Sequence, residues 1–467
     1  MGRRETRKHL PIDDSFWVWL DSSETPMHVA ALAIFEPDDE SASAAAQRVV
    51  AGFRKRTDVD PRFRAVIRMR RFPRRARRER ADDIDIDRHL RHHALSGTDG
   101  ETALAQLISR LQSNRLDMRR PPWEVHVIAG LPGNRFAVYL KAHHAVINGV
   151  DAVRLLGRSL ATDADATALT PVWTIGRPRP QPTASDGRAR AARPSRARVL
   201  FAALRAVGTL YRARPTNSAL TSPFAAPRSP LNVGVGSRRE VCTASIDLGT
   251  IKDLSKASGT SLNDIVLTAC STALRRYLLD IDGLPDKPLI AGCPVSIAAP
   301  EGSSADSSIG IMFADLATDR ADPGARLLTI SRSTTAAKEH QAALPHAALV
   351  PYAVLAMAPH TIRQVVSGAV DVSAPMFNLI ISNVPGPSRS RYLAGARMVG
   401  LYPLSLLFKG EALNITAVSY AGRLNLGFTA CPTALPRVQL LTRYAEEAFE
   451  ELEIRHATAV ADLSRPA

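Results

Sequence analysis

A segment rich in proline, arginine and small residues, Arg177 to Arg198, divides this chain of 467 residues. Such a composition buries too little apolar surface to become ordered, so the segment is predicted to be a linker. The chain is too long for one compact core, and its 45% hydrophobic residues suffice for two. We therefore expect an N-terminal domain over 1–176 and a C-terminal domain over 231–467, joined through a basic linker and crossover helix over 177–230.

Both halves predict a mixture of strands and helices, which places the chain in the α/β (α+β) class. The N-terminal half predicts a strand, a helix, a hairpin and a second helix, at Val29–Phe35, Glu101–Arg115, Trp123–Ile128 with Arg135–Ala142, and Val150–Leu160. The C-terminal half predicts strands at Arg239–Ile246, Leu289–Ser296, Asn378–Ser382, Ala412–Tyr420 and Arg423–Thr429, and helices at Asn263–Leu279 and Arg437–Leu452. A further apolar helix, Val199–Tyr211, is expected either to pack on the core or to lie on a membrane surface.

Two adjacent histidines, His143 and His144, follow the second hairpin strand and precede a helix. Loops at strand ends commonly present functional side chains. A histidine can take a proton from an alcohol that attacks a carbonyl, which accelerates such reactions roughly 10²–10⁴-fold. We expect His144 to be the general base and His143 to support the backbone or tune its neighbour. The similar pair His92-His93 follows an acidic, arginine-flanked loop and is not expected to be catalytic.

The chain carries a net charge of +15, concentrated in two arginine-rich tracts. One tract runs from Arg62 to Arg80 and the other from Arg177 to Arg198. Such charge is either solvated surface or an attraction to anionic lipid. Neither tract belongs to a recognisable nucleic-acid-binding fold that would add base contacts, so no nucleic acid partner is expected.

No uncharged apolar run approaches the about 20 residues that span a bilayer, so no transmembrane helix is expected. The basic start continues into Pro11, Asp13 and Asp14 where a secretion signal would be apolar, which favours the cytoplasm. The four cysteines stand far apart, without C-x-x-C or paired histidine spacing. They are predicted to be reduced core thiols, and no metal site is expected.

At the histidine pair the sequence resembles the bacterial wax ester synthase/diacylglycerol acyltransferase family, whose signature is HHxxxDG. Here the signature is His143-His144 followed by Asn148-Gly149. Further resemblances occur in the expected order along almost the whole chain, at Pro11 to Phe16, Pro26 to Val29, Leu116 to Glu124, Ser261 to Leu278, Ser382 to Pro387 and Ser419-Tyr420.

The resemblance implies a CoA-dependent acyltransferase fold similar to that of chloramphenicol acetyltransferase, with an active-site tunnel between the two domains. It implies transfer of a long-chain acyl group from acyl-CoA to diacylglycerol, or to a long-chain alcohol, at the inner membrane face or on lipid inclusions. His144 would deprotonate the hydroxyl, which attacks the thioester directly, so no cofactor beyond the acyl-CoA substrate is needed.

The resemblance also suggests substrate-binding residues in the C-terminal half. Asn263 is a candidate oxyanion donor, although an asparagine before an apolar helix also suits an N-cap. The other candidates are Asp264, Asn383, Pro385 and Gly386.

Three positions depart from the family pattern. Asn148 replaces the signature aspartate, which in related folds pairs with an arginine and shapes the histidine loop. Ile297-Ala298 and Gly310-Ile311 replace an arginine and a Gly-Asn pair. A catalytically weakened member that binds lipid or acyl-CoA without turnover therefore remains an alternative, as does a condensation enzyme acting on carrier-protein thioesters.

Overall fold

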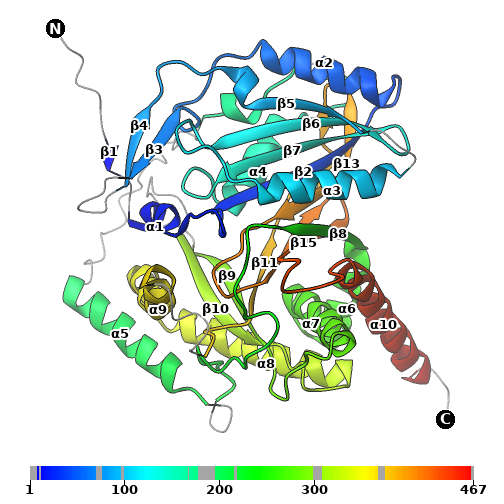
Figure 1. Ribbon diagram of the computed structural model, residues 1–467. Coiled ribbons are helices and arrows are strands. Elements are labelled where there is room, and N and C mark those ends of the chain that lie inside the picture. Colours follow the sequence, from blue (N-terminus) through cyan, green and yellow to red (C-terminus); the bar gives the residue numbers. More distant parts are fainter. Residues whose placement is uncertain are drawn as a thin grey trace, which may run out of the picture.

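The computed structural model describes residues 8–9, 12–69, 76–95, 99–166, 168–176, 195–214, 218–297, 308–366 and 374–463. The chain forms two halves, each built on a six-stranded mixed sheet with helices packed on it (Figure 1). The expected α/β class is confirmed. Most of the predicted linker, 177–194, lies outside the described residues.

The N-terminal sheet has the strand order β12-β13-β2-β7-β6-β5. Helices α2 and α4 pack on one face, and helix α3 packs on the other. The predicted hairpin is confirmed as β6 and β7. The bounds are β2 His28–Glu36, α2 Ala42–Arg54, η1 Ile86–Arg88, β5 Leu90–Ala94, α3 Gly100–Ser113, β6 Trp123–Leu131, β7 Arg135–His143, α4 Gly149–Ser159, η2 Val172–Thr174, β12 Tyr392–Leu393 and β13 Ala396–Leu404.

Two strands of this sheet, β12 and β13, come from the C-terminal half of the chain. Strand β13 pairs antiparallel with β2, from Arg397 opposite Glu36 to Leu404 opposite Ala30. Without β13, the backbone groups on that side of β2 would have no strand partner. The apolar side chains Met398 and Leu401 are also buried in the N-terminal core. The N-terminal sheet is thus complete only with residues that the predicted boundary gives to the C-terminal domain.

The C-terminal sheet has the order β10-β9-β11-β14-β15-β8. Strands β14 and β15 form the predicted hairpin, whose turn residues Ala421 and Gly422 both have positive φ, as a two-residue hairpin turn requires. The bounds are β8 Glu240–Asp247, α6 Leu248–Ser258, α7 Leu262–Asp280, β9 Ile290–Ile297, β10 Ser308–Asp315, α8 Pro323–Ala342, β11 Leu379–Val384, β14 Leu413–Tyr420, β15 Arg423–Ala430 and α10 Leu440–Leu463.

Helices α5 (Arg196–Arg212) and α9 (His346–Val366) pack together at one side of the molecule (Figure 1). Tyr211 donates a hydrogen bond from its hydroxyl to the carbonyl of Ala356, at 2.9 Å. The predicted apolar helix therefore does pack on the core, but only along one face, because Leu200 and Phe201 are exposed. No helix among the described residues is long and apolar enough to span a membrane.

The short helix α1 (Ile12–Leu20) lies between the halves, above α9 in Figure 1. A small three-stranded sheet on the same side contains part of the first arginine-rich tract, in the order β1-β4-β3. Its strands are β1 Lys8–His9, β3 Ala65–Met69 and β4 Ala76–Arg80. The four cysteines carry free thiols, and three of them are buried, as expected.

Candidate active site

His144 lies immediately after β7, in the turn that leads to α4, as predicted. Strand pairing places His143 opposite His28 of β2, and the backbone N–H of His144 donates to the carbonyl of Met27 at 2.8 Å. The His144 ring stacks on Trp17 of α1, with ring centroids 3.7 Å apart and planes 28° apart. The end of β7, the start of β2 and α1 together therefore fix the orientation of this imidazole.

Burial and the neighbouring His143 lower the pKa of His144 to about 3, and a contact with its own backbone carbonyl only partly opposes them. The ring is consequently neutral at physiological pH and has a lone pair available to accept a proton. Its Nδ1 atom is buried and has no hydrogen-bond partner among the described residues. A neutral, oriented imidazole can accept a proton, but a pKa of about 3 lies well below the working pH and makes the ring a weak base in the unliganded site.

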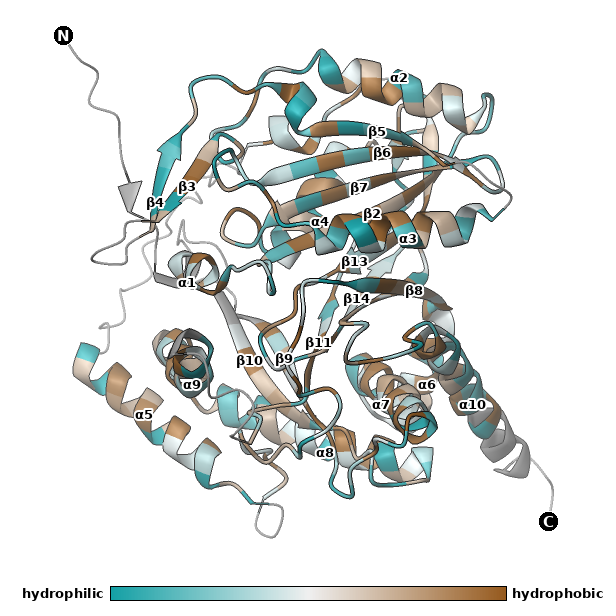
Figure 2. Cartoon of the chain, viewed as in Figure 1, coloured by the Kyte–Doolittle hydropathy of each residue, from teal (hydrophilic) through white to brown (hydrophobic). Residues whose placement is uncertain are grey.

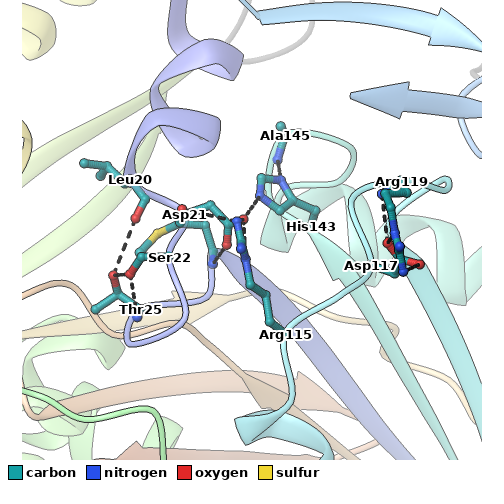
Figure 3. Close-up of polar contacts among 10 residues, drawn as sticks. Leu20, Asp21, Ser22, Thr25, Arg115, Asp117, Arg119, His143 and Ala145 are labelled. Carbon is teal, nitrogen blue, oxygen red and sulfur yellow. Dashed lines mark hydrogen bonds and ion pairs between the residues drawn. The ribbon is translucent and has the colours of Figure 1, made fainter. Parts of the chain in front are cut away.

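His143 points to the other side of the strand and is only 1% exposed. Its Nδ1 accepts the backbone N–H of Ala145 at 3.1 Å, so the ring proton is on Nε2. That nitrogen faces the carboxylate of Asp21, 3.9 Å away (Figure 3). Burial lowers the pKa of His143 to about 4, although Asp21 raises it. His143 therefore holds the turn and is not exposed to a substrate, which agrees with the supporting role predicted for it.

Asp21 connects three segments around this turn (Figure 3). Arg115, which follows α3, donates to Asp21 Oδ2 through Nε at 2.9 Å and Nη2 at 2.5 Å. Asp21 Oδ1 accepts the backbone N–H of Met27 at 3.0 Å. Because the carbonyl of Met27 accepts the backbone N–H of His144, Asp21 and Arg115 position His144 through the chain between α1 and β2.

Asn148 is the N-cap of α4, a role different from the arginine pairing of the family aspartate. Its Oδ1 accepts the backbone N–H of Asp151 at 2.8 Å, and its Nδ2 donates to Asp151 Oδ2 at 3.3 Å. Asparagine and aspartate cap helices about equally well. The amide also avoids placing a second negative charge beside Asp151. Gly149 is the first residue of the helix, and an added Cβ would meet open space there.

The C-terminal candidates Asn263 and Asp264 lie in the first turn of α7. The interpretation of Asn263 as an N-cap is wrong, because Ser261 caps the helix. Asp264 closes a capping box by accepting the backbone N–H of Ser261 at 2.9 Å, and its other oxygen accepts the Thr334 hydroxyl at 2.6 Å. Both carboxylate oxygens are thus engaged within the fold, whereas Asn263 stays partly exposed.

Asn383, Pro385 and Gly386 lie at the end of β11 and in the loop beyond it. The backbone N–H of Gly386 donates to the Ser419 hydroxyl at 3.2 Å, and a Cβ at Gly386 would lie 2.2 Å from the Ser419 carbonyl oxygen. This glycine therefore permits a close backbone approach. In the described part of the chain, no hydrogen bond, ion pair or ring contact joins Asn263 or Asn383 to His144.

The second histidine pair belongs to a different polar group. His93 Nε2 lies 2.9 Å from His126 Nδ1, and His126 Nε2 lies 3.3 Å from the carboxylate of Glu124. Strand β5, which carries His93, is at the far edge of the sheet from β13. Within the described ranges, no group of three or more histidine, cysteine or acidic residues could hold a metal ion.

A cavity of about 940 Å³ lies between α3 and the start of β8, with α10 at its rim. Apolar side chains such as Leu32, Ile108 and Val241 line it together with four arginines: Arg110, Arg135, Arg238 and Arg239. His144 is not in its wall. Arg239 nevertheless donates to the carbonyl of Glu24 at 2.6 Å, and thus touches the same segment that holds His144.

The sequence analysis did not identify three residues that hold the histidine turn: Trp17, Asp21 and Arg115. Trp17 is one of two tryptophans in the helix sequence IDDSFWVWL, and the chain contains only four, so this concentration was a usable signal. Asp21 and Arg115 are 94 positions apart, and nothing in the sequence indicated that they pair.

Comparison with known proteins identifies the fold and the family. Residues 10–266 match the wax ester synthase/diacylglycerol acyltransferase catalytic domain, and residues 307–453 match the C-terminal domain of the same proteins. The chain belongs to the wax ester synthase/diacylglycerol acyltransferase family. The resemblance recognised from the histidine motif is thereby confirmed.

Relatives cover nearly the whole chain. A probable diacylglycerol O-acyltransferase, tgs2, of Mycobacterium tuberculosis H37Rv is 38% identical over 460 residues, which cover 94% of this chain and 98% of that protein. The O-acyltransferase WSD of Acinetobacter baylyi is 33% identical over 459 residues, which cover 95% and 96%.

Among solved structures, the wax ester synthase/diacylglycerol acyltransferase from Marinobacter aquaeolei VT8 is 30% identical with a TM-score of 0.78, covering 96% of this chain and 100% of that one. The first condensation domain of the calcium-dependent antibiotic synthetase is 15% identical with a TM-score of 0.59, covering 97% of each chain. This second likeness concerns the fold alone. The expected two-domain acyltransferase architecture is confirmed.

Proposed function

We propose that this chain is an O-acyltransferase that moves a long-chain fatty acyl group from acyl-CoA to the hydroxyl of diacylglycerol, with a long-chain alcohol as a second acceptor. The products are triacylglycerol or a wax ester, together with CoA. The observation that carries the proposal is His144, a neutral imidazole held against Trp17 at the junction of the two halves.

His144 acts as the general base. It removes the proton from the acceptor hydroxyl while the oxygen attacks the thioester carbonyl carbon. The carbon–sulfur bond then breaks, and the imidazolium returns its proton to the departing thiolate, which leaves as CoA. The face of Trp17 stabilises the transient imidazolium, because an aromatic ring attracts a cation placed over it. The reaction is direct and needs no covalent acyl-enzyme.

The cavity between α3 and β8 is our candidate for the acyl-CoA site. CoA carries phosphates and a long polar arm, whereas its acyl chain is apolar. The cavity is lined by four arginines and three glutamates, together with apolar residues of β2 and α3. Arg135 is paired with Glu101, so Arg110 and Arg238 are our candidates for contact with the CoA phosphates. Its contact with the segment before β2, through Arg239, would bring the thioester toward His144.

The acceptors of this reaction partition into lipid, so the chain works at a lipid surface as a peripheral protein. The net charge of +15 supports contact with an anionic membrane or lipid inclusion.

The test is CoA release from palmitoyl-CoA with diacylglycerol or hexadecanol, with the ester identified by mass. His144→Ala should lower the rate roughly 10²–10⁴-fold. His92→Ala, in the exposed position of the other pair, is the matched control and should leave the rate unchanged. A wild-type chain that binds acyl-CoA and releases no CoA with either acceptor would replace this proposal with binding without turnover. A rate that depends on a carrier-protein thioester would indicate condensation chemistry.

A further inference from the structure

Exposed large apolar side chains are concentrated on two packed helices. Of the eleven such side chains in the described residues, six belong to α5 and α9. They are Leu200, Phe201 and Leu204 on α5, and Val350, Val354 and Ile362 on α9. Single exposed apolar residues are common, but a cluster on neighbouring elements marks an interaction surface.

Helix α5 has two distinct faces. Ala203, Ala206 and Leu210 are buried against the protein, at helical spacing. Phe201 and Leu204 lie on the opposite side, where Phe201 is 69% and Leu204 is 50% exposed, and Leu200 lies at the flank between the two faces. Figure 2 shows brown, apolar turns along α5, although this helix is at the edge of the molecule.

The charges of α5 and α9 favour an anionic partner. Helix α5 contains four arginines at positions 196, 198, 205 and 212, and neither α5 nor α9 contains an aspartate or glutamate. With 100° of rotation per residue, Arg198, Arg205 and Arg212 border the exposed apolar stripe. Apolar residues bordered by arginine are typical of helices that lie in the headgroup region of an anionic bilayer. A protein partner with a mixture of positive and negative surface charges would not require a border that contains arginines and no carboxylates.

The same side of the molecule lies next to His144. Helix α9 packs against α1. Its residue His360 contacts Phe408, with ring centroids 5.5 Å apart, and Phe408 stacks with Trp17 at 6.0 Å. Trp17 stacks on His144. A chain of ring contacts thus joins α9 to His144. The cavity beside α3, β8 and α10 lies at the opposite side from α5 (Figure 1).

From these observations we infer that α5 and α9 form a membrane-docking surface. Phe201 and its apolar neighbours insert at the boundary of headgroups and acyl chains of an anionic phospholipid bilayer, the arginines contact phosphates, and the lipid acceptor enters toward His144 past α9 and α1. The inference deepens the proposed function by naming the surface that meets the acceptor, and in that respect it rests on the proposed function.

The experiment measures binding and catalysis separately with the full chain. Binding is measured by co-sedimentation with phosphatidylcholine vesicles, with and without phosphatidylglycerol. Catalysis is measured as CoA release with diacylglycerol supplied in the vesicles, and again with hexanol in solution as the acceptor. The test variant is Phe201→Asp/Leu204→Asp. The matched control is Leu279→Asp, because Leu279 of α7 is 54% exposed and lies away from α5.

We expect the wild type to bind vesicles that contain phosphatidylglycerol more strongly than those that lack it. The double variant should bind roughly tenfold more weakly or worse, because two apolar anchors are replaced by charges that anionic lipid repels. Its rate of ester formation from diacylglycerol in vesicles should fall in proportion to the loss of vesicle binding. Its rate with hexanol in solution should be unchanged. Leu279→Asp should behave like the wild type in each assay.

Three results would overturn the docking surface. The first is unchanged vesicle binding by the double variant, and the second is an equal loss of binding in Leu279→Asp. The third is a dimer in analytical ultracentrifugation that the double variant converts to a monomer while vesicle binding is unaffected, since the face would then join two copies of this chain. If neither the wild type nor any variant forms ester with any acceptor, the proposed function is wrong. The vesicle-binding measurement then still tests the docking surface by itself.

Discussion

The stack of Trp17 on His144 makes a prediction about the chemical step. In Trp17→Leu the ring loses its aromatic neighbour, which lies 3.7 Å away between centroids. An aromatic face over a desolvated cation contributes about 2 kcal/mol, and about 0.5 kcal/mol at an exposed site. His144 is cationic only after it has taken the acceptor's proton, so this stabilisation acts on the transition state and not on the resting enzyme.

Since about 1.4 kcal/mol corresponds to tenfold in rate, kcat should fall roughly 2–30-fold in Trp17→Leu. The KM for acyl-CoA should change little, because Trp17 is not in the wall of the cavity beside α3. Trp17→Phe should retain part of the rate. Trp19→Leu removes the other tryptophan of α1 and controls for damage to this helix. Equal losses in Trp17→Leu and Trp19→Leu, or a change confined to KM, would refute a role of the stack in the chemical step.

Three further predictions concern protonation and the loop. First, kcat/KM should be constant between about pH 5 and 8, because the pKa of His144 is lowered to about 3 and the ring stays unprotonated over this range. A fall in kcat/KM with a midpoint near pH 6.5 would contradict this prediction. Second, thermal unfolding measured by calorimetry should shift to lower temperature between pH 7 and 5. Buried histidines with folded-state pKa values below 6.5 contribute stability above that pH, and each loses up to about 1.4 kcal/mol per pH unit as protons bind the unfolded chain; Glu411, with a raised pKa, acts in the opposite sense. The buried histidines with lowered pKa values are His28, His89, His143, His144 and His360. His93 and His340 also have lowered pKa values but are partly exposed, so each contributes less because solvent screens its charge. Third, Asn148→Asp should keep the cap and change kcat less than about threefold, because either side chain accepts the Asp151 N–H; a large gain in CoA release would show that the missing charge matters.

The local elements were predictable because each depends on short-range pattern. The strand pattern of Arg135 to Ala142 and the Pro-Gly-Asn turn before it predict a hairpin without any information about the rest of the fold. The pairing of β13, from the C-terminal half, with β2 of the N-terminal sheet was not predictable in this way. A strand that reads Ala-Arg-Met-Val-Gly-Leu fits the edge of either sheet, and only the free edge of β2 determines which one it joins.

The same distinction between local pattern and long-range contacts applies to the residues of the candidate site. The position of His144 at a strand end was predictable because it depends on local pattern, and its role as general base stays a prediction. The C-terminal candidates were less secure, since a sequence cannot distinguish a carboxylate that contacts substrate from one that closes a capping box. Asp264 proves to be the second kind, with Ser261 and Thr334 occupying its oxygens. Trp17 acts through a contact between residues 127 positions apart, which only the fold establishes.

The replacement of the signature aspartate by Asn148 is understandable from the way this chain fixes its histidine turn. An ion pair that shapes a buried loop needs one carboxylate and one guanidinium, and it is costly to leave either alone. Here Asp21 and Arg115 form such a pair directly beside His143, and Asp21 also holds the backbone of Met27. Position 148 then has only to cap α4, which asparagine does without charge. Asp21→Asn should accordingly impair turnover more than Asn148→Asp, because it leaves Arg115 without its anion and weakens the link from α1 to the base.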